Sequence, residues 1–433
     1  MPIRLHLVLP VALIAALVAV PAADAKHKKI KRQGGQVQKA WPATKRGKPS
    51  NPYARYLAQQ VGPLTPPNAK KATNGKASAA AAVSATNPLQ LVRSFDIPTN
   101  DPSYARLLNT SFIYDSAAGA AGFVALSQKA QAEQLLDQMS ALQRTDGAID
   151  YAFNVYTGAS DPSLRSGAIA WAGLAATSYG KAYGATKYDS FAAGIATWLT
   201  SQQRPDGLIK GGPDVTWVST QHNLLAYFFF RAQADLTAGK AAAKAYNATA
   251  DKIAVGIDAN LLKPAGTSLY FQQGVADTTH PLDTQTLGIL YLKQRGRTAD
   301  AGKVADYIGA NFALANRSIV KSTVPATYNN TYSAAGPFIG YRPYADDGAP
   351  DVLWMEGTLQ ARFALSQLGR STAALDSSIL SWDNVTGDGA AGPLMADKTV
   401  TNNRFNEYHV WPVSATTSWT LLIIGAQKTF VTN

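Results

Sequence analysis

Two acidic residues stand in apolar surroundings where a carboxyl group could transfer protons. Glu356 lies within Trp-Met-Glu-Gly-Thr at 354–358, inside an apolar stretch, and Asp115 follows Tyr114 at the start of another. Glu and Asp act as general acids and bases when burial and neighbouring charges tune their pKa. Because an ionisable side chain among apolar residues needs a partner or a function, we predict that Glu356 and Asp115 are the catalytic acid and base.

Both acids also have a structural interpretation. Glu356 could form a buried ion pair, with Arg165 or Arg342 as its partner. Asp115 could instead satisfy free backbone N–H groups at a helix N-terminus. The sequence leaves these interpretations open beside the catalytic one.

A second set of polar and aromatic residues is predicted to contact a substrate. Some gather where apolar segments begin, as in Trp-Val-Ser-Thr-Gln-His at 217–222, and others lie in loops rich in Asp, Gly and Tyr. An aromatic face beside polar groups suits a sugar ring, whose C–H face is apolar and whose hydroxyls need partners. The predicted substrate-binding residues are His222, Asp146, Asp150, Tyr151, Tyr156, Trp217, Gln221, Asp283, Arg342, Tyr344, Trp354 and Trp411.

Structural roles compete for several of these residues. A turn is the simplest interpretation of Asp146, which precedes a glycine. Helix capping is the simplest for Asp283, and packing between helices for Trp354 and Trp411. His222 could equally be a buried histidine bonded to a carbonyl.

Other common chemistries find no support in the residues. The 433-residue chain has no Cys, which excludes thiol nucleophiles, thiolate metal sites and disulfides. It contains no His-x-x-x-His pair, no Gly-x-Ser-x-Gly elbow and no glycine-rich phosphate loop. We therefore expect neither a cofactor nor a metal in the site.

The formal net charge of +12 is concentrated near the N-terminus. Residues 26–80 hold 13 Lys or Arg and no Asp or Glu, whereas residues 81–433 hold 26 basic against 27 acidic residues, a net charge of −1. This composition, with many Pro, Ala, Gln and Asn, predicts a disordered, low-complexity tail over residues 26–90. The tail could contact anionic envelope polymers or lipid head groups, or act only as a solvated spacer. No specific nucleic-acid binding is expected.

The first 25 residues have the pattern of a secretory signal peptide. A basic Arg4 precedes a largely apolar stretch at 5–20, and Ala-Asp-Ala at 23–25 fits a cleavage site. Cleavage after Ala25 is favoured over an uncleaved anchor because the apolar stretch is short for a membrane span. We expect a secreted, periplasmic or cell-envelope protein.

Helical periodicity recurs from about Ser94 onward and organises the rest of the chain. Apolar segments, expected to be buried on all sides, alternate with amphipathic segments that carry one polar face. The first set covers residues 112–126, 163–177, 218–232, 281–292, 351–365 and 412–425. The second set covers residues 130–142, 187–202, 241–262, 298–312 and 371–381. Short β-hairpins are expected at 268–272 and 328–344. Six helical hairpins can close a ring, so we predict an all-α toroid domain over residues 91–433.

Local motifs give this pattern a resemblance to a known superfamily. They are Tyr-Asp-Ser at 114–116, Gln-Arg-x-Asp-Gly at 143–147 and 203–207, and the Trp-Met-Glu-Gly-Thr stretch. Over residues 100–428 the chain resembles the six-hairpin glycosidases, carbohydrate-active (α/α)6 toroids with the active cleft at one mouth of the ring. The resemblance implies an exported glycoside hydrolase that cleaves a poly- or oligosaccharide, with Glu356 and Asp115 as the two carboxyl groups such cleavage requires.

Two other functions fit the same residues. A polysaccharide lyase on this toroid would use His222, Tyr151 or Tyr344 to move a proton and Arg342 to neutralise a uronate carboxylate. A non-catalytic envelope protein would bind a glycan in the ring and use the basic tail as an anchor. Reaction products distinguish the three, because a lyase leaves an unsaturated sugar that absorbs ultraviolet light, a hydrolase does not, and a binding protein yields none.

Overall fold

The computed structural model describes residues 51–64, 88–99, 101–319, 334–383, 392–401 and 405–430. The predicted signal peptide and most of the predicted tail, residues 26–50 and 65–87, lie outside these ranges. Within them, no helix is long and apolar enough to cross a membrane.

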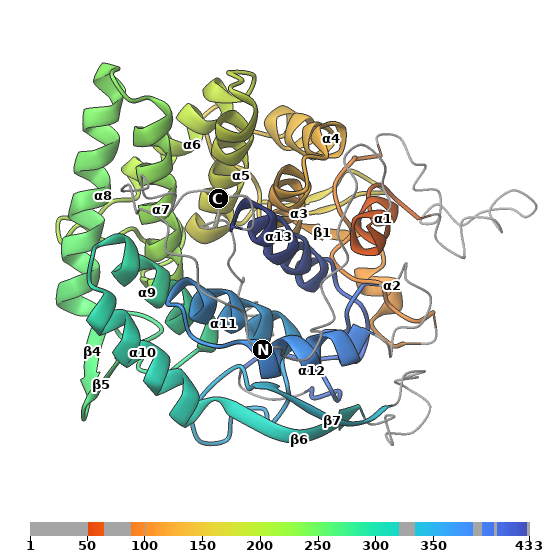
Figure 1. The fold of residues 1–433 in the computed structure, drawn as a ribbon. Coiled ribbons are helices and arrows are strands. Elements are labelled where there is room, and N and C mark those ends of the chain that lie inside the picture. The colour runs from red at the N-terminus through yellow and green to blue at the C-terminus, as the bar shows by residue number, and fades with distance from the viewer. Residues whose placement is uncertain are drawn as a thin grey trace, which may run out of the picture.

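A closed ring of six inner helices forms the centre of the described chain (Figure 1). These helices are α3 (Ile113–Ala125), α5 (Ser166–Tyr183), α7 (Thr220–Leu236), α9 (Leu282–Gln294), α11 (Met355–Gln367) and α13 (Ser414–Phe430). Each helix packs against the next, and α13 packs against α3. Their surfaces are buried nearly all round, as the many Ala, Gly and apolar residues in their sequences predict. The predicted all-α toroid is thus confirmed.

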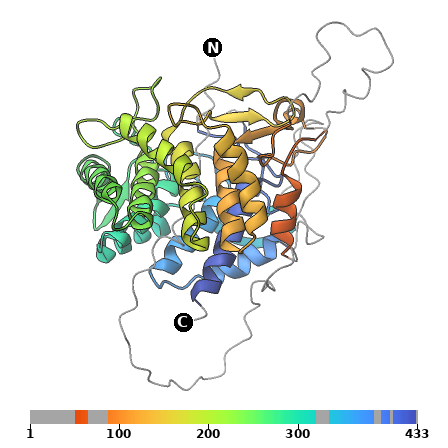
Figure 2. The same cartoon turned by 90° about the horizontal axis from the view of Figure 1, so that it is seen from above.

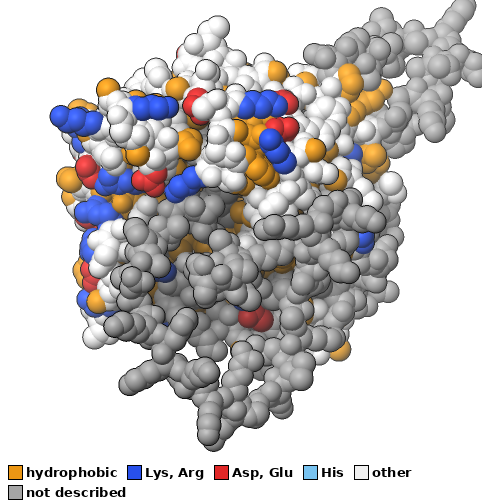
Figure 3. Space-filling model, turned by 45° about the horizontal axis from the view of Figure 1, so that its top comes forward, with side chains coloured by type: hydrophobic (Ala, Val, Ile, Leu, Met, Phe, Trp, Pro, Cys, Tyr) orange, Lys and Arg blue, Asp and Glu red, His pale blue; other side chains and the backbone are white. Residues whose placement is uncertain are grey.

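Outer helices lie around the ring (Figure 1), and each buries only part of its surface. They are α4 (Lys129–Ala141), α6 (Asp189–Ser201), α8 (Ala241–Asn260), α10 (Thr298–Asn311) and α12 (Ala373–Asp383). In α4 the buried residues Ala132, Leu135, Leu136 and Met139 follow the spacing of a single helix face. Figure 3 shows basic and acidic side chains interspersed on the described surface, in keeping with the near-neutral charge beyond residue 80.

A helix within the predicted disordered tail corrects the domain boundary. Helix α1 (Pro52–Gln59) packs against α13 at the outside of the ring (Figures 1 and 2). The Asn51 side chain caps it by accepting from the N–H groups of Tyr53 and Ala54 at 3.0 and 3.2 Å. Tyr53, Ala54, Tyr56 and Leu57 are buried. The average composition of residues 26–90 concealed this short apolar face, so disorder was the wrong prediction for residues 51–64.

The few strands lie in connections: the hairpin expected at 268–272 is present, residues 328–333 of the second expected hairpin lie outside the described ranges, and the sheet β1–β2–β3 was not predicted. Strands β1 (Thr110–Phe112), β2 (Ala152–Asn154) and β3 (Ser160–Asp161) form one antiparallel sheet (Figure 2). Strands β4 (Leu262–Ala265) and β5 (Ser268–Phe271) form a hairpin, and β6 (Ala313–Ile319) pairs with β7 (Ala334–Tyr341). The short helix α2 (Tyr104–Leu107) precedes β1.

These strand-bearing connections share one end of the toroid. Inner and outer helices alternate in direction, so every connection from an outer helix to the next inner helix returns to the end where inner helices begin. We call this end the inner mouth. It carries the first turns of α3, α5, α7, α9, α11 and α13, and so collects residues from along the whole chain.

Candidate active site

Three buried carboxyl groups open inner helices at the inner mouth. Asp115, Asp283 and Glu356 stand in the first turns of α3, α9 and α11. The exposed fraction of the residue is 5% for Asp115, 4% for Glu356 and 0% for Asp283. The structure therefore places Glu356 and Asp115 at the same end of the ring, with Asp283 deeper.

A tyrosine from another inner helix holds Glu356. The Tyr114 hydroxyl donates to Glu356 Oε1 at 2.7 Å. Burial, and to a lesser degree the charges of Asp115 and Asp283, raise the pKa of Glu356 well above its ordinary value, while the Tyr114 bond and the nearby Trp419 indole oppose this. The raised pKa favours the protonated form of Glu356, which a proton donor requires.

The alternative of a buried ion pair at Glu356 is wrong within the described residues. Arg165 pairs instead with Asp214 at 2.9 Å. The Nε atom of Arg342 is buried and has no hydrogen-bond partner in the described chain. A neutral hydroxyl, and not a guanidinium, is thus the partner of Glu356.

Asp115 lies in the first turn of α3, as the structural interpretation also allows, but it is not the N-cap of the helix. That position belongs to Phe112, and no side chain caps α3 there. Burial raises the pKa of Asp115 to about 7, opposed by a hydrogen bond with Ser94. A carboxyl group that titrates near neutrality can exchange a proton with substrate or water.

Asp283 is engaged on both oxygens. Oδ1 accepts the backbone N–H of Thr284 at 2.6 Å, and Oδ2 accepts from Gln221 Nε2 at 2.9 Å. The first contact engages the N–H of the next residue, but the N-cap of α9 is Pro281 and no side chain caps the helix there, so Asp283 is a first-turn acid and not the predicted cap. Burial raises the pKa of Asp283 to about 7 even though these bonds oppose it.

His222 and Trp217 form a neighbouring pair at the start of α7. Their rings meet edge-on with centroids 5.3 Å apart. Burial and the Arg165 charge lower the pKa of His222 to about 3, and its Nδ1 has no partner among the described residues. The imidazole is therefore neutral at ordinary pH. Trp217 keeps 40% of its exposure, so its ring is available to a ligand.

Three buried tyrosines in the connections lie close enough to the carboxyl groups to feel their charge. The Tyr344 hydroxyl accepts from Asn406 Nδ2 at 2.9 Å. Burial raises the pKa of Tyr344 and Tyr408, and the charge of Asp283 adds to both. Burial likewise raises the pKa of Tyr151, which lies near Asp115 and Arg165. The raised pKa favours the neutral form of each of these hydroxyls.

Other predicted residues lie apart from the carboxyl groups or have structural contacts. Asp146 accepts the N–H of Ala148 at 3.0 Å in a turn, as the turn interpretation predicts. Asp206 makes the same contact with Leu208 at 3.1 Å, so the two Gln-Arg-x-Asp-Gly motifs build one kind of turn. Asp150 binds Ser160 Oγ at 2.6 Å.

The remaining predicted aromatics divide by exposure. Trp354 is buried and meets Tyr408 edge-on, with ring centroids 6.3 Å apart. Trp411 is buried in a small apolar cluster and stacks on His409 at 3.9 Å, which agrees with the packing interpretation. Tyr156 is half-buried on the β2–β3 connection.

Tyr114, Tyr408, Asn406 and Trp419 belong to the site but were not among the predicted site residues. Tyr114 was visible only as the neighbour of Asp115, and Tyr408 as one of several loop aromatics. No spacing rule in the sequence joins residue 114 to residue 356 or residue 419. Within the described ranges, no three His, Cys, Asp or Glu side chains form a group that could hold a metal ion.

Comparisons with known proteins concern the fold. No protein-family model and no curated protein sequence matches the chain. A glycosidase variant in complex with glucose superposes with a TM-score of 0.56 at 10% identity, over 88% of this chain and 99% of that one. A family 76 glycoside hydrolase (mannosidase) from Bacteroides thetaiotaomicron gives 0.54 at 11% identity, over 88% and 98%. A D-mannose isomerase gives 0.51 at 11% identity, over 78% and 92%.

These matches run through nearly the whole of each neighbour while few residues are identical. They therefore concern the ring of helical hairpins and leave the chemistry to be argued from the site. The chain is a six-hairpin (α/α)6 toroid with the fold of these glycosidases.

Proposed function

We propose that the chain is a glycoside hydrolase in which Glu356 is the general acid and Asp115 the general base. The observation that carries this proposal is the Tyr114–Glu356 hydrogen bond beside Asp115 at the inner mouth. Glycoside cleavage needs one carboxyl group that stays protonated and a second that can ionise. The pKa of Glu356 is raised well above its ordinary value, which favours the protonated acid, whereas the pKa of Asp115 is about 7, which allows it to ionise.

The contacts suggest how the proton is held. Tyr114 occupies Oε1 of Glu356, which leaves Oε2 to carry the proton that the leaving glycosidic oxygen receives. Asp115, with a pKa of about 7, accepts a proton from the attacking water once it is ionised. Asp283 is fully buried and accepts hydrogen bonds on both carboxylate oxygens. These contacts suit a residue that positions the Gln221 side chain and not one that transfers a proton.

The lyase alternative is less well supported. It needs a base to remove a carbon-bound proton, and the lowered pKa of His222 makes its imidazole a weak base. The fold itself does not choose between reactions, because the D-mannose isomerase has a similar ring. We prefer hydrolysis because the pKa values of Glu356 and Asp115 are raised to different degrees, which suits one acid and one base.

Export and the role of the tail rest on the sequence. We propose that residues 1–25 direct secretion to the cell envelope or beyond. Residues 26–50 carry nine Lys or Arg and no acid, so this stretch is proposed to contact anionic envelope polymers or lipid head groups. The helix α1 that follows belongs to the toroid.

Incubation of the chain with polysaccharides tests the function. The panel includes α-mannan, because structural neighbours are described as mannosidase and mannanase, with other neutral and acidic glycans. New reducing ends without ultraviolet absorbance, lost in Glu356→Gln and Asp115→Asn, would support hydrolysis. Absorbance would establish a lyase instead, an altered monosaccharide without cleavage an isomerase, and binding without products a receptor.

A further inference from the structure

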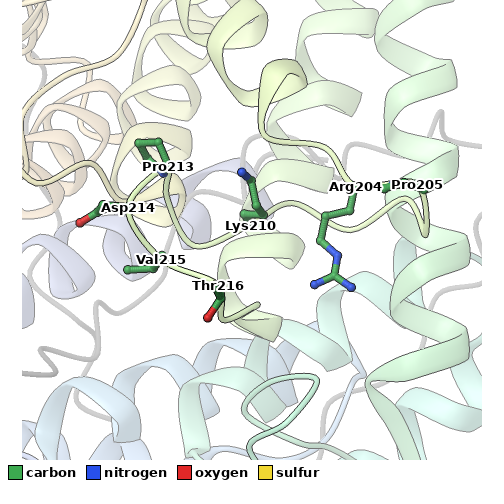
Figure 4. Close-up of a pocket in the computed structure, with 7 residues that line it drawn as sticks. All are labelled: Arg204, Pro205, Lys210, Pro213, Asp214, Val215 and Thr216. Atoms are coloured by element: carbon green, nitrogen blue, oxygen red, sulfur yellow. The ribbon is translucent and has the colours of Figure 1, made fainter.

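A pocket lies in the connection between α6 and α7, and none of the three buried carboxyl groups of the candidate active site lines it. Its volume is about 560 Å³, and its polar lining comes from Arg204, Lys210, Asp214 and Thr216. Figure 4 shows Lys210 between Arg204 on one side and the 213–216 segment on the other. The connection runs from an outer helix to an inner one, so the pocket belongs to the inner mouth.

The pocket carries one uncompensated positive charge. Arg204 pairs with Asp206 at 2.8 Å, and Asp214 pairs with Arg165 at 2.9 Å. No carboxylate of the described chain lies within ion-pair distance of Lys210, although this side chain is half-buried and lines the pocket. A Lys ammonium without a counter-ion beside an open pocket attracts an oxyanion.

Trp217 directly follows the pocket-lining residue Thr216 and is partly exposed. Its ring lies so close to Gly211 that a Cβ atom there would be 2.0 Å from the indole, and the Arg165 guanidinium lies 6.0 Å from the ring centroid. The indole is thus fixed by backbone on one side while 40% of the residue stays exposed. A partly exposed aromatic ring held in place in this way can stack against a sugar ring.

The first turn of α7 connects the pocket to the carboxyl groups. Trp217 contacts His222, and the adjacent Gln221 donates to Asp283 at 2.9 Å. Asp283 in turn contributes to the electrostatics of Glu356. The first turn of α7 thus links Trp217, next to the pocket, with Gln221, which contacts one of the buried acids.

We propose that this pocket is a subsite for an anionic sugar, whose ring stacks on Trp217 and whose carboxylate or phosphate is bound by Lys210. The inference rests on the proposed hydrolase function and deepens it, because it makes the substrate an acidic glycan. Both Lys210 and Trp217 belong to the connection at 204–217, so the proposed subsite is a feature of this connection and not of the helical ring.

Matched glycan pairs test this subsite with the full chain. Each pair holds an acidic oligosaccharide and its neutral counterpart: oligogalacturonides with their methyl esters, and phosphorylated mannan oligosaccharides with the dephosphorylated form. Calorimetry gives the affinity ratio within each pair, and reducing ends are followed in parallel. The variants are Lys210→Gln, Lys210→Arg, Trp217→Ala and the control Lys244→Gln, an exposed lysine on the outer helix α8.

The subsite predicts that the wild-type chain prefers the acidic member of at least one pair, and the pair concerned identifies the anion. Lys210→Gln should reduce the ratio about tenfold, as loss of one charge-assisted contact does, while Lys210→Arg and Lys244→Gln keep it. Trp217→Ala should weaken both members of that pair. A ratio that survives Lys210→Gln, or no acidic preference in any pair, overturns the subsite.

Parallel hydrolysis separates the two proposals. Cleavage of neutral glycans without an acidic preference contradicts the subsite alone. A Lys210-dependent preference without cleavage of any glycan contradicts the hydrolase assignment alone.

Discussion

The Tyr114 hydroxyl on α3 donates to Glu356 on α11 at 2.7 Å, across a sequence separation of 242 residues. The two helices are not neighbours in the ring, since α13 packs against both. The bond therefore joins two sides of the inner mouth. It also constrains the carboxyl group that the proposed reaction uses as its acid.

Replacement of Glu356 should remove turnover. Glu356→Gln keeps the size of the side chain and an acceptor for Tyr114 but cannot donate the proton, so kcat should fall about 10²- to 10⁴-fold. Steady-state rates on the cleaved glycan measure this. Glu133→Gln, on the outer helix α4, is the matched control and should keep the parental rate; equal rates in both variants would refute the acid role.

Loss of the Tyr114 hydroxyl should change the pH profile. The bond lowers the pKa of Glu356, so Tyr114→Phe raises it and keeps the acid protonated to higher pH. The alkaline limb of the kcat profile should move upward. A lower rate with an unmoved limb would mean that Tyr114 only supports the packing of α3 and α11.

Ionisation of Asp115 should set the acid limb of the pH profile of kcat/KM. Because its pKa is raised to about 7 and a base must be ionised, kcat/KM should rise as the pH passes about 7. Asp115→Asn should lose both the rate and this limb. An acid limb near pH 4 in the parent would show that another group is the base.

Buried Asp283 should make the fold less stable at higher pH. Its pKa is about 7 in the folded chain and about 3.9 in an unfolded one. The folded state therefore holds a proton that the unfolded state releases, and its stabilising effect, complete below about pH 4, is lost as pH rises through about 7. Asp283→Asn should show a smaller fall in the free energy of unfolding between pH 5 and 8 than the parent, measured by urea denaturation; an unchanged fall would contradict the linkage.

Helix α1 should contribute to the stability of the toroid. Leu57 is fully buried, so Leu57→Ala should lower the free energy of unfolding by about 2–5 kcal/mol. Gln59→Ala, on the exposed face of the same helix, should change it little. Deletion of residues 1–50 should leave the thermal midpoint in place and deletion of residues 1–64 should lower it; equal midpoints would place α1 outside the cooperative fold.

The helices were predictable because their information is local. Alternation between stretches that are apolar all round and stretches with one polar face indicated inner and outer helices, and α3 lies within one residue of its expected bounds at each end. The capped segment at 51–59 escaped because its apolar residues are few and lie within a long basic, polar range. The average composition of such a range does not reveal one short amphipathic helix within it.

By itself, the sequence determined the toroid, the alternation of its helices and the concentration of positive charge before the ordered ring. It also singled out Glu356 and Asp115, because acids in apolar helices are costly without a role. Only the tertiary structure decided that the partner of Glu356 is Tyr114 and not an arginine, and that the Trp217 ring packs against Gly211, next to the pocket-lining Lys210. Closure of the ring brings the first turns of distant helices to one mouth, and no local pattern records which of those side chains then meet.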